Sequence, residues 1–258
     1  MLIVRACLRD GRGGSPTAVL DDGPFTDAER RAVPVRAGTS HAVFLGAAGA
    51  LRFCTSEGEL PACGHGTVAA LAVLAARAPG RRIELALRAG GRTFAGRASF
   101  DGEVCHAAFD PGPVTLRAPT GDEAGEVLGA LGLAAADLAG APCVASVGRE
   151  RLLVPVASRA ALAALAPDLE RLRAVPALLG CYVYSPPGPD GRAAARMFAP
   201  SIGVPEDIAN ANSTACLAAY LGADVAVDMG DALGEPATVT ATVRGGAVEV
   251  GGTARPVS

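Results

Sequence analysis

The chain has 258 residues, and half of them are hydrophobic, which is enough to bury one substantial core or two smaller ones. Its formal net charge is −3, and its basic residues are all arginines that are scattered along the sequence. This charge pattern argues against a surface for nucleic acid or anionic membranes. The apolar runs also stop well short of the roughly 18 residues that a membrane span needs. We therefore expect a soluble, cytoplasmic protein with neither a nucleic-acid nor a membrane partner.

The cysteines and histidines argue against a disulfide framework and against a metal centre. The seven cysteines are odd in number and contain no CxxC pair, which is typical of reduced thiols. Only three histidines are present. No glycine-rich nucleotide-binding motif stands between a predicted strand and a predicted helix. The sequence therefore predicts an enzyme or binding protein without a metal or other cofactor.

In chain order, strand-like and helix-like segments alternate over two halves of similar design. The first half has predicted strands at 2–8, 17–20, 42–45, 51–55, 83–88, 92–100 and 104–109, and predicted helices at 27–36 and 68–78. A Pro/Gly-rich segment at 110–113 ends it. The second half has predicted helices at 122–131, 135–138, 159–166 and 214–221, and predicted strands at 143–147, 152–155, 180–185, 194–198, 238–243 and 247–250.

Each half contains one helix that is apolar on all sides, at 68–78 and at 214–221. Such a helix is usually buried. We therefore predict an α+β protein of two pseudo-symmetric lobes, 1–112 and 113–258, each a strongly curved mixed or antiparallel sheet wrapped round its central helix. The last strand can return to the N-terminal lobe. Pockets commonly form at such domain interfaces, so a binding cleft is expected between the lobes.

Small and polar residues precede both apolar helices, at 61–67 and at 206–214. The start of a helix has unpaired N–H groups and a partial positive charge, so two such starts facing each other would bind a carboxylate. The predicted substrate-binding residues in these two segments are Gly64, Gly66, Thr67, Asn210, Ala211, Asn212 and Ser213.

Six short segments then connect the chain to a known family. They are GSPTAV (14–19), TSHAVFL (39–45), ELPACGHGT (59–67), LVPVAS (153–158), MFAPSIGVPED (197–207) and VGGTA (250–254). In this order they resemble the PhzF-like isomerases of phenazine biosynthesis, which share the diaminopimelate epimerase fold with proline racemases. The resemblance implies this epimerase-like fold, an isomerase that needs no cofactor, and a homodimer.

The resemblance also implies site residues, with several departures from the family pattern. His41 stands where the family has its proton-shuttling glutamate, and an imidazole can exchange a proton near neutral pH. Cys63 stands where two-base racemases have a catalytic cysteine, and a thiol at the start of a helix is a plausible base. His65 and Asp207 match the family and complete the predicted catalytic set. Ser15 replaces the usual asparagine and is a further predicted contact to substrate.

The sequence therefore predicts proton-shift isomerisation of a small carboxylate, with pyrroline- or proline-derived compounds of a natural-product or antibiotic pathway as one candidate class. Three alternatives remain open. One is an amino-acid or hydroxyproline racemase or epimerase that uses Cys63, although the second racemase cysteine is replaced by Ile208 and Cys216 lies further along the helix. The others are a catalytically inactive small-molecule-binding homologue and a pericyclase that only folds its substrate.

Overall fold

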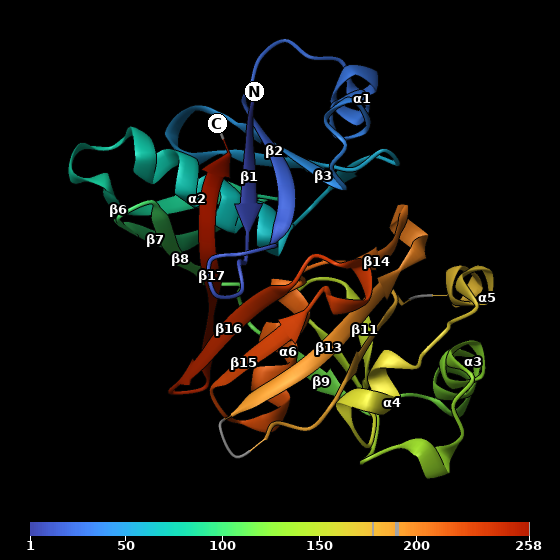
Figure 1. The fold of residues 1–258 in the computed structure, drawn as a ribbon. Coiled ribbons are helices and arrows are strands. Elements are labelled where there is room, and N and C mark those ends of the chain that lie inside the picture. Colours follow the sequence, from blue (N-terminus) through green and yellow to red (C-terminus); the bar gives the residue numbers. More distant parts are fainter. Residues whose placement is uncertain (177, 189–190, 258) are drawn as a thin grey trace.

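The computed structural model describes residues 1–176, 178–188 and 191–257 and has a mixed α+β architecture, as predicted. Within these residues, six α-helices accompany a network of 17 paired strands. Figure 1 shows the first half of the chain, in blue to green, above the second half, in green to red. None of the helices in the described part of the chain combines the length and apolar character needed to cross a membrane.

The first half consists of eight strands and two helices. They are β1 (Leu2–Ala6), β2 (Ser15–Asp21), α1 (Asp27–Ala37), β3 (His41–Leu45), β4 (Leu51–Cys54), β5 (Glu59–Leu60), α2 (Gly64–Arg77), β6 (Arg82–Ala89), β7 (Arg92–Asp101) and β8 (Val104–Phe109). Helix α1 has local caps at both of its ends. Thr26 and Glu29 form a capping box at its start, and Gly38 ends it in the left-handed conformation.

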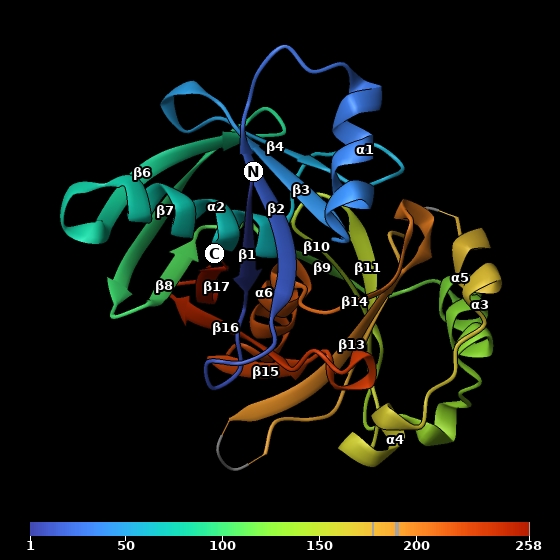
Figure 2. The ribbon, with the colours of Figure 1, turned by 45° about the horizontal axis from the view of Figure 1, so that its top comes forward.

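The second half has four helices and nine strands. They are β9 (Thr115–Arg117), α3 (Gly121–Leu131), β10 (Cys143–Ser146), β11 (Glu150–Pro155), α4 (Arg159–Ala163), α5 (Leu169–Ala174), β12 (Cys181–Tyr184), β13 (Arg192–Ala199), β14 (Val204–Asp207), α6 (Ala211–Leu221), β15 (Val225–Met229), β16 (Ala237–Arg244) and β17 (Ala247–Val257). Figure 2 shows α3, α4 and α5 together on one outer side of this half, away from α2.

The two central helices begin earlier than the sequence patterns predict. Helix α2 begins at Gly64 instead of residue 68, and α6 begins at Ala211 instead of residue 214. Glycine and small polar residues have weak helix propensity, so tertiary packing determines the first turn of both helices. The predicted helix at 135–138 is a 3₁₀ turn, Ala135–Asp137, and β5, β9, β14, β15 and α5 were not predicted.

Strand β17 joins the two halves of the sheet. It pairs with β16 of the second half, and also with β1 and β8 of the first half, all in antiparallel register. In Figure 1 it runs upward from the red strands into the blue and green half. The prediction placed the end of this strand near residue 250, but the chain stays extended to Val257 because β1 and β8 supply backbone partners.

Helices α2 and α6 form the apolar centre of the molecule. The strands curve around them, and one core cluster contains side chains from both helices, including Leu71 and Leu217, each fully buried. The two helix starts touch: a Cβ atom placed on Gly64 would lie 2.5 Å from Cβ of Ala211. Glycine at position 64 therefore permits this close approach.

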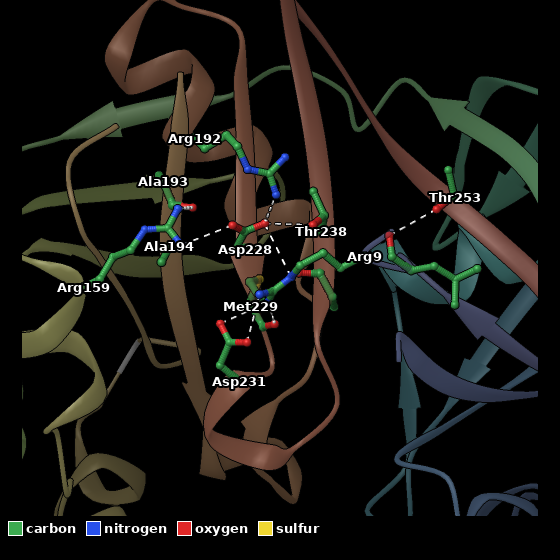
Figure 3. Close-up of polar contacts among 12 residues, drawn as sticks. Arg9, Arg159, Arg192, Ala193, Ala194, Asp228, Met229, Asp231, Thr238 and Thr253 are labelled. Carbon is green, nitrogen blue, oxygen red and sulfur yellow. Dashed lines mark hydrogen bonds and ion pairs between the residues drawn. The ribbon is translucent and has the colours of Figure 1, made fainter. Parts of the chain in front are cut away.

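A cluster of polar contacts around Asp228 fixes the loop after β1 to the second half, as Figure 3 shows. Arg9 donates to the backbone oxygen of Met229 at 2.6 Å and forms an ion pair with Asp231 at 2.9 Å. The buried carboxylate of Asp228 also contacts the guanidinium of Arg159 at 3.2 Å and accepts from Thr238 at 2.8 Å. The contacts of Arg9 link residues more than 200 positions apart in the sequence.

Candidate active site

A cavity of about 210 Å³ lies at the starts of α2 and α6. Its walls come from both halves of the chain and are largely apolar, with aromatic rings from Phe53, Phe94 and Phe109. The polar and charged side chains that line it are His41, Cys63, His65, Thr67, Arg92, Asp110, Arg149, Arg151, Asp207, Asn210 and Asn212. A mostly apolar cavity with a few converging polar groups is the usual form of a small-molecule site.

Three potential acid–base side chains converge at the start of α2. Cys63 is the N-cap residue of this helix, His65 lies in its first turn, and His41 begins β3 beside it. Cys63 Sγ is 3.5 Å from His65 Nε2, and the two imidazole rings meet edge to face at 4.4 Å between centroids. All three side chains are at least 94% buried, so they act in a nearly water-free environment.

The other nitrogens of the two histidines contact neighbouring backbone or hydroxyl groups. Nδ1 of His65 donates to the backbone oxygen of Ala209 at 2.8 Å, so its ring is held by the segment that leads into α6. Nδ1 of His41 lies 2.9 Å from Oγ of Ser40. These contacts orient Nε2 of His65 toward Cys63 and fix the ring of His41 by a single hydrogen bond.

Asp207 and Asn210 form the opposite edge of the site at the start of α6. Asn210 is the N-cap of α6: its Oδ1 accepts from the N–H of Ser213 at 2.9 Å, and its Nδ2 donates to Oδ2 of Asp207 at 3.0 Å. The other oxygen of Asp207 lies 3.8 Å from Nδ1 of His65 and has no hydrogen-bond partner among the described residues. One buried carboxylate oxygen thus remains available for a ligand.

The environment gives the two contacting histidines opposite protonation states. Burial lowers the pKa of His41 well below its ordinary value, and the positive charge of His65 lowers it further. Burial alone would also lower the pKa of His65, but the electrostatic interactions with Cys63 and Asp207 outweigh it and raise this pKa to about 10. Burial raises the pKa of Asp207. At neutral pH, His41 is therefore a neutral base and His65 an acid.

The structure brings most of the predicted site residues to one cavity. His41, Cys63, His65 and Asp207 all line it, and so do Gly64, Thr67, Asn210 and Asn212. The other four predicted binding residues, Ser15, Gly66, Ala211 and Ser213, are buried and do not line the cavity. Ala211 packs on Gly64, and a side chain on Gly66 would lie 2.9 Å from Cys63 Sγ, so both small residues make room for neighbouring groups.

Three arginines of the cavity were not predicted from the sequence: Arg92, Arg149 and Arg151. Arg151 is 2% exposed, although long charged side chains are rarely buried. No signal for it was available in the sequence, since Arg151 ends the polar run at 149–151, just before the predicted strand at 152–155. A two-thiol racemase would need a second cysteine in the cavity. Cys216 is buried within α6, and neither Cys216 nor Ile208 is among the residues that line the cavity.

The side chains of His41, Cys63 and His65 are also able to hold a metal ion. Their potential ligand atoms all lie within 4.8 Å of one another. Two imidazoles and a thiolate form a donor set that suits Zn²⁺.

Comparisons with solved structures define the class as epimerase-like isomerases. A predicted epimerase from Pseudomonas aeruginosa superimposes on the whole chain with a TM-score of 0.84, at 27% sequence identity and covering 96% of that protein. A hydroxyproline epimerase from Agrobacterium vitis, solved with bound trans-4-hydroxy-L-proline, shares the fold at a TM-score of 0.57 and 14% identity, with 100% of this chain and 88% of that one covered.

Sequence comparisons identify the family of the chain. The chain belongs to the phenazine biosynthesis-like family, PhzC-PhzF, whose model matches residues 9–258. An uncharacterized isomerase from Deinococcus radiodurans is 31% identical over 271 residues, which cover 95% of this chain and 88% of that protein. The resemblance drawn from six short segments is therefore confirmed, and the protein is a member of the PhzF-like isomerases.

Proposed function

We propose that this protein is a cofactor-independent isomerase that moves a proton, and with it a C=C double bond, in a small carboxylate bound in the cavity. The observation that carries the proposal is the convergence of His41, Cys63 and His65 at the uncapped start of α2. His41 comes from β3, and Cys63 and His65 come from the start of α2, yet all three line one largely apolar cavity.

The opposite protonation states of the histidines assign the roles. His41 is neutral at pH 7, and in the tautomer whose Nδ1 donates to Oγ of Ser40, Nε2 is the atom that removes an acidic C–H proton. His65 keeps its proton and returns one at another carbon of the conjugated system. Pairs of groups whose pKa values are pushed apart by their environment are typical acid–base pairs. Cys63 is held beside His65 and is the second candidate base.

The start of α2 is the proposed site for the carboxylate. Cys63 makes no side-chain cap hydrogen bond there. The first N–H groups of a helix and its dipole together favour an anion. Asp207 lines the same cavity, and a carboxylate with one unpaired oxygen is suited to accept from an amino or ring N–H group of the substrate.

A nitrogen-containing carboxylate fits both of these contacts. Pyrroline- and proline-derived carboxylates of natural-product pathways are therefore the first compounds to test. From the sequence we also retain a homodimeric state and a cytoplasmic location, which light scattering on the purified protein and cell fractionation would test.

The decisive experiment is incubation with unsaturated pyrroline carboxylates in deuterium oxide. We expect a shifted ultraviolet absorption band and deuterium bound to carbon. His41→Ala should reduce the exchange rate by about 10²- to 10⁴-fold, the usual contribution of a positioned base. His106→Ala is the matched control, because His106 lies on β8 outside this cavity.

The competing functions give different results. Product without deuterium indicates a pericyclase, and the absence of exchange for every carboxylate indicates a binding protein. Full exchange in both His41→Ala and Cys63→Ala would remove the proposed roles of these residues. Inversion at the α-carbon that is lost in Cys63→Ser, detected by chiral chromatography, would favour the racemase, which the position of Cys63 in the cavity supports as the second candidate.

A further inference from the structure

Arg151 is a buried cation that forms no ion pair with any residue that the structure describes. Its side chain lines the cavity and is 2% exposed. Nη1 donates to Sγ of Cys216 at 3.4 Å, and Nη2 donates to the backbone oxygen of Arg149 at 2.6 Å. Its Nε is buried and has no hydrogen-bond partner among the described residues.

No carboxylate forms an ion pair with Arg151 anywhere in the described part of the chain. The nearby glutamates are engaged elsewhere: Glu150 pairs with Arg117, and Glu206 pairs with Arg196. The thiol of Cys216 does not serve as an anion either, because burial raises its pKa. Burying a charge without a partner is strongly unfavourable, so such groups are usually paired or bind a ligand.

The position of Arg151 in β11 also argues for a ligand. Arg151 pairs in the sheet with Ala145, and it faces α6, as does Leu153 two residues later, which belongs to the central core. An apolar side chain of similar volume would fit this inward-facing position of β11 without burying a charge. An arginine here places a positive charge in the wall of the cavity.

Two more arginines add positive charge to the same cavity. Arg149 lines it next to Arg151, and Arg92 lines it from β7 while donating to the backbone oxygen of Pro111 at 2.9 Å. Neither of them makes an ion pair with a described residue. Asp110 is the one acid on this side, and its Oδ1 accepts from the N–H of Gly112 at 2.7 Å.

We propose that the substrate is a dianion, whose first carboxylate binds at the start of α2 and whose second carboxylate binds to Arg151, with Arg149 and Arg92 beside it. The inference rests on the proposed function for the first contact and adds the substrate class. The planar guanidinium of arginine is suited to two parallel hydrogen bonds with a carboxylate. The aromatic walls of Phe53 and Phe94 enclose the unsaturated carbon chain between the two charged ends.

Glutaconate and its monomethyl ester form a matched pair of probes. They have nearly the same size and differ by one negative charge. Calorimetric titration should show that the wild-type protein binds glutaconate at least tenfold more tightly than the ester, a factor of about ten to a hundred being typical for one charge-assisted contact. Equal affinity for the two probes would overturn the proposal.

Variants then locate the second carboxylate. Arg151→Met should abolish the preference for the dianion, and Arg151→Lys should retain part of it because the charge remains. Arg171→Met is the control, since Arg171 is an exposed arginine of α5 that contacts the backbone of Gly129. A preference that persists in Arg151→Met shows that the contact lies elsewhere and contradicts the proposal.

Thermal unfolding of the ligand-free variants separates binding from structure. If Arg151 is kept for a ligand, Arg151→Met should melt at the same temperature as the wild type or higher, because an unpaired buried charge is removed. A large decrease in melting temperature, together with an unchanged preference in Arg151→Lys, would assign Arg151 a structural role.

The same probes distinguish this inference from the proposed function. Removal of a proton from the CH₂ group of glutaconate and its return at the other end of the three-carbon unit regenerates glutaconate, so deuterium uptake reports the proton transfer alone. A dianion preference without deuterium uptake retains the second carboxylate site and contradicts proton transfer on this probe. If both probes take up deuterium and bind with equal affinity, the proposed proton transfer stands and the proposed second carboxylate site is contradicted.

Discussion

The starts of α2 and α6 are alike in sequence character but differ in how their polar groups are used. Helix α6 is capped by Asn210, whose side chain also donates to Asp207. The polar side chains at this end are therefore hydrogen-bonded to each other and to the helix backbone. Helix α2 begins at Cys63 without a side-chain cap, and its first turn carries His65 beside His41. The comparison shows that two helix starts of similar sequence can have different roles in one site. One end positions groups, and the other keeps its reactive groups and N–H donors available.

The largest expected effect comes from removing the acid at the α2 start. His65→Gln should lower kcat by about 10²- to 10⁴-fold. In the wild type, the rate should fall at high pH as His65 loses its proton near pH 10, and at acidic pH well below 6.5 as His41 gains one. The variant should lose the alkaline limb of the profile of kcat/KM. An unchanged alkaline limb would assign it to another group.

The proton on His65 should also make stability depend on pH. Its pKa in the folded protein is above the ordinary value of 6.5, so its contribution is complete below that pH and disappears as the pH rises to about 10. Urea denaturation should show a free energy of unfolding that decreases over this interval. The decrease should be absent in His65→Gln.

The second prediction breaks the contact between the two helix starts. In Gly64→Ala the new methyl group would lie 2.5 Å from Cβ of Ala211, so the starts must move apart. We expect a loss of about 1–3 kcal/mol in the free energy of unfolding from the overpacked contact. Activity should fall by about 100-fold, because small misplacements of catalytic groups are costly.

A matched control and a rescue sharpen this test. Gly121→Ala changes the first residue of α3, where nothing lies within 4 Å of the added methyl group, and it should leave both activity and stability nearly unchanged. The double variant Gly64→Ala with Ala211→Gly should recover much of both losses. Additive effects of the two substitutions would show that this contact does not couple the helix starts.

The third prediction uses Zn²⁺ as a reporter of the groups at α2. Zinc ions should inhibit the wild type by occupying His41, Cys63 and His65, and chelation should restore activity. Cys63→Ala should bind zinc more weakly and resist inhibition, while His106→Ala should behave as the wild type. Titration calorimetry and activity assays check both effects. Zinc binding that survives in Cys63→Ala would place the ion elsewhere.

The smallest effect is expected at the capped start of α6. Asn210→Ala removes the cap on Ser213 and the contact to Asp207, so we expect a loss of about 1 kcal/mol in the free energy of unfolding. Activity should fall by less than about tenfold, through the altered position of Asp207. Thr120→Ala removes the cap of α3 at a similar cost and should not change activity. Equal activities of the two variants would separate Asn210 from the site.

Much of the fold followed from local patterns. Helix α1 was predicted almost to the residue because its caps are encoded within a few positions of its ends. Strand β15 was missed, since Val225–Met229 is a short run whose place is fixed by pairing with β13 and β16. Short strands of this kind depend on distant partners, which local propensity does not contain.

The sequence by itself determined the residue types of the site: His41, Cys63, His65 and Asp207 stood out from their order and from their resemblance to a family. Only the tertiary structure decided what surrounds them. It buried His41 against His65, which drives their pKa values in opposite directions. It also brought Arg151 to the same cavity, where no acid of the described chain forms an ion pair with it. Protonation and charge pairing depend on distances and burial, and both are set by contacts between residues remote in sequence.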